Sequence, residues 1–527
     1  MLIGCTGNSG KDNPVPRVDT AALPQAANDI SLPGGFSEQR DLRFDSAFVS
    51  TFLSRYPAFR SFEPRIRQFY RGRNFAYAWF DGNGMIEQGS NLYNKIINIR
   101  EEGLPVKLLY TAEFENAIQQ SASASDNKPD TTAELMLTAQ YFFYAQHVWT
   151  GLGIKGMQAV NWDLPHKKLS YEALLDSLLE VPSSRFMTTE PIYPQYAQLK
   201  EVLKKYRAIE EAGGWPIIKA DRSFYRKGDS GLALAVVRRR LFASGEFMGD
   251  TASFVFDDAL ESAVKDFQQR NGLKEDGVIS AAVLKELNFP VAKRIEQLVV
   301  NMERCRWLPV AIRNNYIVIN IPEYKFHAFE QDSLAWSMNV VVGTELNKTA
   351  IFNGLIQTVV FSPYWNVPTS IMQKETLPAI RRDKNYMARN HMEWNGNAIR
   401  QVPGPWNALG RVKFLFPNSH SIYLHDTQAK SLFGLDKRAF SHGCIRVAEP
   451  KRLAEYLLRF QPEWTSDKID AAMNSGKEQF VKINKPVPVY IAYFTAWVDR
   501  KGRVNFRDDV YKRDSRLAKM LFENSAP

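Results

Sequence analysis

Cysteine is scarce in this sequence of 527 residues, with one residue each at positions 5, 305 and 444. Three widely separated cysteines exclude a disulfide-stapled fold, and they also exclude a zinc site made of cysteines alone. Long hydrophobic runs are missing too, since no stretch reaches the about 20 consecutive apolar residues of a membrane-spanning helix. The composition is otherwise globular, with 45% hydrophobic and 24% charged residues, and the length suits about three or four domains.

Acidic residues are fewer than basic ones, 57 against 67, which gives a formal net charge of +10 at pH 7. This balance suits an anionic partner such as nucleic acid, lipid headgroups or cell-wall polymer, and it also fits a solvated basic surface. Residues 65–80 interleave arginines with aromatic side chains, as some nucleic-acid interfaces do. We favour the core of a helical domain with exposed arginines, so no nucleic-acid partner is predicted.

The segment Leu2-Ile3-Gly4-Cys5 resembles the lipobox of a bacterial lipoprotein, in which the cysteine carries the lipid. Residues 1–35 are rich in small and polar residues with little apolar periodicity, which predicts a flexible tether. The basic and apolar segment that normally precedes the box is missing, so a chance match stays open. The resemblance implies lipidation of Cys5 and a location on the periplasmic side of the bacterial envelope.

Helical spacing of apolar residues runs through residues 36–220 and predicts a helical scaffold domain. Within it, residues 151–156 match the Gly-x-Gly-x-x-Gly dinucleotide fingerprint by letter. A helical pattern precedes them instead of a strand, so no dinucleotide is predicted. Residues 221–292 contain a glycine turn, a helix, a second helix ending at Gly272, and a third helix after an Asp-Gly turn, which predicts a small three-helix module.

Residues 293–500 begin with a helical pattern and continue as β-branched and alternating runs, which predict a mostly-β domain. The strand pattern lapses at about 369–410, and so long an interruption predicts an inserted lid. Residues 501–527 are predicted to be a C-terminal tail. The predicted fold class is therefore multidomain α+β.

A cysteine and two histidines near the end of the β domain form the candidate chemical site. Cys444 needs a base or a positive neighbour to become a thiolate at neutral pH, and His425 and His442 both qualify. Gly443 can adopt an unusual conformation and aim its N–H at an oxyanion, and Asp426 can hold the base in one tautomer. Two other interpretations of these three side chains stay open. They could be a buried structural cysteine beside hydrogen-bonded histidines, or they could form a metal site.

Residues 441–446 read Ser-His-Gly-Cys-Ile-Arg and resemble the S-H-G-C-[IV]-R signature of L,D-transpeptidases with a YkuD-type catalytic domain. Residues 362–368, 404–410 and 422–427 resemble further blocks of the large, multidomain branch of this family. The three-helix pattern of residues 221–292 resembles the peptidoglycan-binding-like module of the same branch, which follows a helical scaffold and precedes the catalytic domain.

The resemblance implies peptidoglycan cross-linking by acyl transfer. Cys444 would attack a donor tetrapeptide stem and form a thioester, and an acceptor amine would resolve it into a 3→3 cross-link. His425 would be the general base, and the N–H groups of Gly443 and Cys444, together with the Tyr423 hydroxyl, would stabilise the oxyanion. The resemblance also implies that carbapenems acylate the active cysteine, and it implies no metal and no organic cofactor.

The remaining candidates surround this centre. Arg446 is expected to bind a substrate carboxylate or to form a structural salt bridge. His442 is a weaker catalytic candidate, because some family members carry serine there. The predicted substrate-binding residues are Trp365, Trp406, Asn407 and Ser441.

Three other functions stay open at this point. Water could resolve the thioester, which would give an L,D-carboxypeptidase, or a lysine of an outer-membrane protein could do so, which would anchor that protein to the wall. The chain could also be a non-catalytic wall-binding scaffold. Cys305 lies between two arginines in a helical pattern and is predicted to be a packing residue. The oligomeric state is not predicted.

Overall fold

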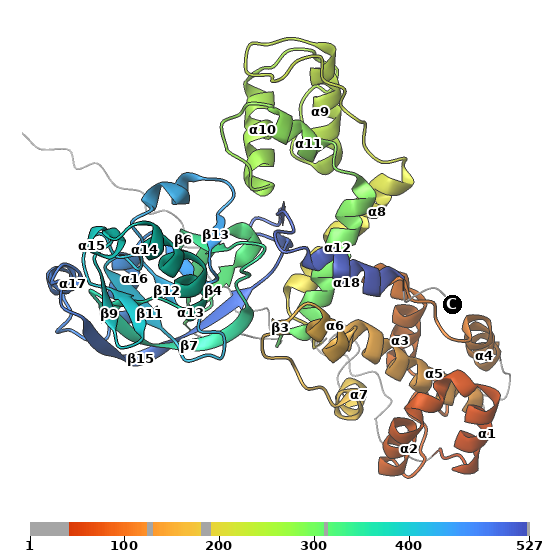
Figure 1. Cartoon of the computed structure of the whole chain (residues 1–527). Helices are drawn as coiled ribbons and strands as arrows, with labels where there is room; N and C mark the ends of the chain where they lie inside the picture. Colours follow the sequence, from red (N-terminus) through yellow and green to blue (C-terminus); the bar gives the residue numbers. More distant parts are fainter. Residues whose placement is uncertain (1–41, 124–129, 181–190, 310–314, 524–527) are drawn as a thin grey trace, which may run out of the picture.

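The computed structural model describes residues 42–123, 130–180, 191–309 and 315–523, and Cys5 with its predicted tether lies outside them (Figure 1). A helical scaffold, a small helical module and a β-rich domain are distinct in Figure 1, which confirms the predicted multidomain α+β class. Among the described residues, no helix combines the length and the apolar character needed to cross a membrane.

The scaffold is organised around α5 (Thr131–Tyr144), most of whose residues are buried. The Asp130 side chain accepts the N–H of Thr132 and so caps the start of this helix. The surrounding helices present apolar faces to α5 and to one another. They are α1 (Ala47–Arg55), α2 (Glu63–Gly72), α3 (Glu87–Ile97), α4 (Thr111–Ser123), α6 (Gly153–Ala159), α7 (Tyr171–Glu180) and α8 (Gln195–Glu211).

The small module consists of α9 (Leu232–Ser244), α10 (Asp258–Arg270) and α11 (Ala281–Leu287) around a core of its own. Asp257 and Ser280 cap α10 and α11 by accepting backbone N–H groups. The order of turns and helices agrees with the pattern read from the sequence.

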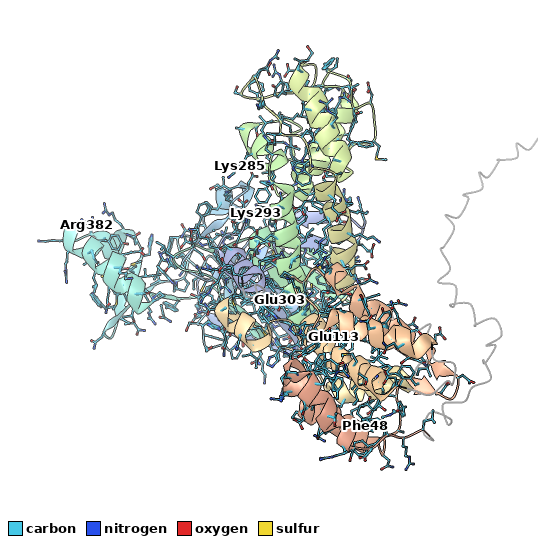
Figure 2. All side chains as sticks on the ribbon, turned by 90° about the vertical axis from the view of Figure 1, so that its right-hand side faces the viewer. Phe48, Glu113, Lys285, Lys293, Glu303 and Arg382 are labelled. Carbon is cyan, nitrogen blue, oxygen red and sulfur yellow. The ribbon has the colours of Figure 1, made fainter. Side chains whose placement is uncertain are left out.

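A long helix, α12 (Val291–Trp307), runs from the module along α8 (Figure 1). Its buried Arg306 pairs with Glu303 at 3.0 Å and donates to the backbone oxygen of Glu102 at 2.9 Å. Glu303 also accepts the N–H of Leu152 at 2.6 Å, and a Cβ on Gly151 would collide with its carboxylate. Glu303, which is labelled in Figure 2, is completely buried. The predicted start of the catalytic domain at residue 293 thus falls inside a helix that packs against the scaffold.

The β-rich domain holds one large mixed sheet in the order β11-β12-β14-β6-β5-β4-β15-β7-β3, with β13 pairing with β6. The strands are β3 (Trp162–Asp163), β4 (Tyr316–Asn320), β5 (Lys325–Glu330), β6 (Ser333–Gly343), β7 (Ile351–Phe361), β11 (Val412–Leu415), β12 (Leu424–His425), β13 (Ala439–Ser441), β14 (Ile445–Val447) and β15 (Gln479–Ala492). The pairs β12–β14, β4–β15, β3–β7 and β6–β13 are parallel, and the other pairs of this sheet are antiparallel.

A subdomain interrupts the large sheet where the lid was predicted. It has a three-stranded sheet, β8 (Trp365–Asn366), β10 (Ala398–Gln401) and β9 (Met392–Asn395), in that order. A helical stretch lies between β8 and β9 in the chain and is made of α13 (Thr369–Ile371), η7 (Met372–Thr376), α14 (Leu377–Arg382) and α15 (Tyr386–Arg389). Figure 2 shows this stretch standing out from the body of the domain with Arg382 near its outer end.

The C-terminal segment is more than the predicted tail of residues 501–527. It contains a hairpin of β16 (Ala496–Val498) and β17 (Val504–Phe506), followed by α18 (Arg513–Phe522). The buried Arg270 of the small module donates to the backbone oxygen of Val504 at 2.9 Å. The segment therefore ties the module to the rest of the molecule.

Candidate active site

The parallel pair β12–β14 brings the predicted histidine and cysteine together. In its register Leu424 lies opposite Ile445, and His425 lies opposite Arg446. Tyr423 directly precedes β12 and lies two residues before His425, so in an extended chain the two side chains point to the same side. The Tyr423 and His425 rings are 5.7 Å apart. The loop of residues 441–444 enters β14 beside them.

Cys444 is half-buried, and its thiol contacts the backbone oxygen of Ser421 at 3.8 Å. Burial raises the pKa of Cys444, while hydrogen bonds from the backbone and hydroxyl of Tyr423 and the charge of Arg446 lower it. Burial also raises the pKa of Tyr423, with the nearby Cys444 acting in the same direction. The resting site thus holds a neutral thiol with a phenol donor at its sulfur.

His425 is buried, and its Nδ1 lies 2.5 Å from the backbone oxygen of Asp426. Burial and then the charge of Arg446 lower the pKa of His425 to about 4. The ring is therefore neutral at pH 7, and a proton on Nδ1 that binds this oxygen leaves Nε2 free to accept another. No direct hydrogen bond joins His425 to the thiol of Cys444 in the described structure.

Asp426 holds the His425 ring through its backbone oxygen, and its carboxylate makes no hydrogen bond to the imidazole in the described structure. It accepts the N–H groups of Arg411 at 2.9 Å and of Thr427 at 2.7 Å, and it pairs with Lys430. The backbone oxygen of Asp426 holds the ring, and its carboxylate fixes the loop that carries that oxygen.

The loop before Cys444 is fastened by Ser441, which is buried. The Ser441 hydroxyl donates to the backbone oxygen of Cys444 and accepts the N–H of Gly443 at 3.1 Å. The expectation that the Gly443 N–H faces an oxyanion is therefore corrected, because that N–H already has a partner. Gly443 has φ +116°, which favours glycine, and the Cys444 N–H has no hydrogen-bond partner among the described residues.

The surroundings of His442 do not favour a catalytic role. Its side chain is exposed, and its Nε2 lies 3.0 Å from the Glu375 carboxylate of the inserted subdomain. His442 thus connects the cysteine loop to η7. Sequence reasoning missed Glu375, which lies 67 residues before His442 in a polar stretch without a motif.

Arg446 is half-buried and makes no salt bridge within the described residues, and its Nε is buried without a partner. Burial lowers the pKa of Arg446, and the neighbouring Cys444 opposes this shift. The structural salt bridge considered for Arg446 is therefore absent among the described residues. Its unpaired guanidinium, close to the thiol, can bind a carboxylate.

The four predicted substrate-binding residues separate into two groups. Trp365 is half-buried on β8, and Trp406 is 37% exposed and stacks on His391 with ring centroids 3.8 Å apart. Asn407 is fully buried and donates to the backbone oxygens of Pro363 and Val402, each at 3.0 Å. Asn407 and Ser441 therefore hold loops in place, and only the two tryptophans are open to a ligand.

Cys305 is fully buried in α12, and burial raises its pKa to about 12. Within residues 42–523, as far as they are described, no three His, Cys, Asp or Glu side chains form a cluster that could hold a metal ion.

Three family models match segments of this chain. Residues 314–489 match the family model described as "L,D-transpeptidase catalytic domain", and residues 231–287 match that of a "Putative peptidoglycan binding domain". Residues 64–203 match a model described as "Scaffold domain". The chain therefore carries one region similar to the YkuD L,D-transpeptidase catalytic domain and one similar to a putative peptidoglycan-binding domain.

The chain is also similar to one curated protein and to several solved structures. A protein of Haemophilus influenzae named "Putative L,D-transpeptidase" is 31% identical over 242 residues, which cover 42% of this chain and 49% of that protein. The chain thus spans about half the length of the curated relative. An L,D-transpeptidase structure from Xylanimonas cellulosilytica is 13% identical with a TM-score of 0.18 and is covered completely, matching 52% of this chain. One from Mycobacterium smegmatis is 13% identical with a TM-score of 0.20, covering 34% of this chain and 58% of that one.

Proposed function

We propose that the chain is a peptidoglycan L,D-transpeptidase that forms 3→3 cross-links through a thioester on Cys444. The observation that carries the proposal is that Cys444 and Tyr423, each directly before a strand of the parallel pair β12–β14, lie next to each other, with His425 on β12 close to Tyr423. The match to the catalytic-domain family supports this reaction class, and the peptidoglycan-binding module supports stem peptides as the substrate.

The first step transfers the acyl group to sulfur. Nε2 of the neutral His425 takes the thiol proton while Cys444 Sγ forms a bond to the carbonyl carbon of the donor stem. The carbonyl oxygen becomes an oxyanion, which the Cys444 N–H and the Tyr423 hydroxyl stabilise. When the bond from carbon to nitrogen breaks, the terminal D-alanine leaves with the proton from His425. The product is a neutral thioester and a neutral imidazole.

The second step consumes the thioester. The amine of a second stem attacks the same carbonyl carbon, and His425 takes a proton from its nitrogen. The bond from carbon to sulfur then breaks, and the proton returns to Cys444. Because His425 is neutral at the start and at the end of each step, it can act as the base in both steps of one cycle.

Arg446 supplies the positive charge that a stem carboxylate requires. Its guanidinium is unpaired among the described residues and lies close enough to Cys444 to affect the pKa of the thiol. A bidentate contact there would orient the donor stem over the sulfur. The inserted subdomain, joined to the cysteine loop by Glu375 and His442, would act as the lid that orders the acceptor.

A wall digestion assay tests the proposal. Purified peptidoglycan is incubated with wild-type protein, Cys444→Ala or the matched control Cys305→Ala, digested to muropeptides and weighed. We expect 3→3 dimers from wild type and from Cys305→Ala, and none from Cys444→Ala. Shortened stems without dimers would indicate a carboxypeptidase, and stems joined to protein an anchoring enzyme. No mass change with wild type would contradict catalysis and favour a wall-binding scaffold.

The location remains part of the proposal. The lipobox resemblance of residues 2–5 supports a lipid on Cys5, which would hold the enzyme on the periplasmic side of the envelope. One acyl chain gives only weak membrane binding, so several chains would be needed for a stable anchor. Cell fractionation of Cys5→Ala tests this point, and unchanged membrane association of the variant would contradict it.

A further inference from the structure

The loop that follows β6 turns sharply beside the cysteine loop. Gly343, the last residue of β6, donates its N–H to the Thr349 hydroxyl at 2.9 Å. A Cβ on Gly343 would approach the Asn347 backbone oxygen to 2.0 Å, so the turn closes tightly on a residue without a side chain. Thr349 is completely buried within this turn.

The Thr349 hydroxyl reaches from this turn into the active-site loop. It donates to the backbone oxygen of Gly443 at 2.8 Å while it accepts the N–H of Gly343, so its one proton and one of its lone pairs are both used. Gly443 precedes Cys444, so its carbonyl belongs to the same peptide unit as the Cys444 N–H. Thr349 therefore contacts the one peptide group that links the glycine to the nucleophile.

The geometry of a peptide unit turns this contact into an effect on catalysis. A trans peptide is planar, and its C=O and N–H point in opposite directions. No cis peptide is found among the described residues. A Gly443 oxygen held by Thr349 consequently directs the Cys444 N–H away from Thr349, where it has no hydrogen-bond partner in the described structure.

We propose that Thr349 is a positioning residue that aims the Cys444 N–H at the oxyanion. The inference rests on the proposed acyl transfer at Cys444. Glycine at 443 makes such a device necessary, because a residue without a side chain leaves the peptide plane free to rotate. A freely rotating peptide unit would lose the preorganised donor on which oxyanion stabilisation depends.

The C-terminal segment supports Thr349 from behind. Tyr511 is buried, and its hydroxyl accepts the N–H of Thr349 at 3.2 Å and donates to the backbone oxygen of Gly343 at 2.7 Å. Its own N–H donates to the Tyr493 hydroxyl at 2.8 Å. A hydrogen-bonded path thus runs from residue 511 through Thr349 to Gly443, which assigns part of the C-terminal segment to the active site.

Two reactions of the same cysteine separate positioning from general structural damage. Acylation by a carbapenem passes through an oxyanion, whereas alkylation by iodoacetamide displaces iodide and forms none. Thr349→Val removes the hydroxyl at nearly constant volume. We expect its acylation rate to fall about 10- to 100-fold, a part of the about 10²–10³-fold cost of losing an oxyanion donor, with alkylation unchanged. Thr349→Ser, which keeps the hydroxyl, should restore acylation.

Tyr511→Phe provides a second variant, because it leaves the bond between Thr349 and Gly443 in place. In this variant too the acylation rate should fall while the alkylation rate is unchanged, but the fall should be smaller than in Thr349→Val. Thr138→Val is the matched control: Thr138 is also fully buried, and its hydroxyl contacts Tyr70 at 2.6 Å and Trp79 at 2.8 Å, within the scaffold. Both reactions should stay at the wild-type rate in this control.

The outcomes distinguish this inference from the proposed function. Equal losses of acylation and alkylation in Thr349→Val and Tyr511→Phe, or no loss in either reaction, would overturn the positioning role alone. Absence of any acyl adduct on the wild-type protein would overturn the proposed function and this inference with it. Selective loss of acylation with rescue by serine would support both.

Discussion

The two described cysteines lie in regions that share several features and differ in what surrounds the sulfur. Burial raises the pKa of both thiols, and arginine charges lower it at both sites, from Arg304 and Arg306 at Cys305 and from Arg446 at Cys444. Cys305 is fully buried in α12, whereas Cys444 is half-buried in a loop. Only the thiol of Cys444 has the hydrogen bonds of Tyr423 at its sulfur and a neutral histidine on the adjacent strand.

The difference shows that positive neighbours alone do not make a reactive thiol. Thiolate formation needs donors aimed at the sulfur, a base to take the proton and a path for the substrate. The arginines beside Cys305 are instead used for structure, as Arg304 pairs with Asp514 at 2.7 Å and Arg306 with Glu303. Changes that remove one of these features from Cys444 test the comparison.

The largest effect is expected from the base. His425→Ala should slow acylation of Cys444 by the about 10²–10⁴-fold typical of losing a positioned general base. His442→Ala should have a much smaller effect, since that ring pairs with Glu375. Both rates can be followed by intact-mass measurement during carbapenem treatment. A larger loss in His442→Ala would leave the nucleophile in place and reassign the base.

A smaller effect is expected from the phenol at the sulfur. Tyr423→Phe removes a hydrogen bond to a charged intermediate, which is worth about 1.5–3 kcal/mol, so acylation should fall roughly 10- to 100-fold. Tyr193→Phe is the matched control, because Tyr193 lies beside Cys305 and should not affect the rate. Equal rates in wild type and Tyr423→Phe would show that the phenol contributes no catalysis.

The pH dependence of Cys444 alkylation tests the comparison without a mutation at the site. The pKa of Cys444 is raised and that of His425 is lowered to about 4, so the resting pair is neutral and not a thiolate–imidazolium pair. Iodoacetamide alkylation of Cys444 should therefore keep rising with pH beyond the ordinary thiol pKa of about 8.5. The rate is measured from pH 5 to 10 in Cys305→Ala. A plateau below pH 7 would reveal a preformed ion pair.

The smallest effect is expected at the subdomain. Glu375→Gln weakens an exposed contact worth about 0.2–1 kcal/mol, so cross-linking should fall less than about fivefold and acylation should not change. Glu393→Gln, which breaks a pair with Arg400 inside the same subdomain, serves as the control. If acylation fell as much as cross-linking in Glu375→Gln, the subdomain would not act as a lid for the acceptor.

Much of the fold could be predicted because local patterns determine it. Apolar spacing revealed the helical scaffold, and turn residues revealed the three-helix module around α10 and α11. The C-terminal hairpin was missed because β16 and β17 are three residues long, too short for an alternating pattern. The predicted start of the catalytic domain at residue 293 falls inside α12. A helical sequence pattern does not show which domain the helix packs against, because tertiary contacts such as that of Arg306 with Glu102 determine it.

The site was predictable in its residue types and less so in its contacts. A motif placed Cys444 and His425, but the side-chain pattern could not show that Asp426 uses its backbone oxygen or that the Gly443 N–H is taken by Ser441. Thr349 lies 94 residues from its partner Gly443, and no local pattern marks such a contact.

The most direct test asks which cysteine forms the acyl-enzyme. Wild-type protein, Cys305→Ala and Cys444→Ala are treated with a carbapenem, and their intact masses are measured. The account predicts one adduct on wild type and on Cys305→Ala, and none on Cys444→Ala. An adduct that persisted on Cys444→Ala would contradict it.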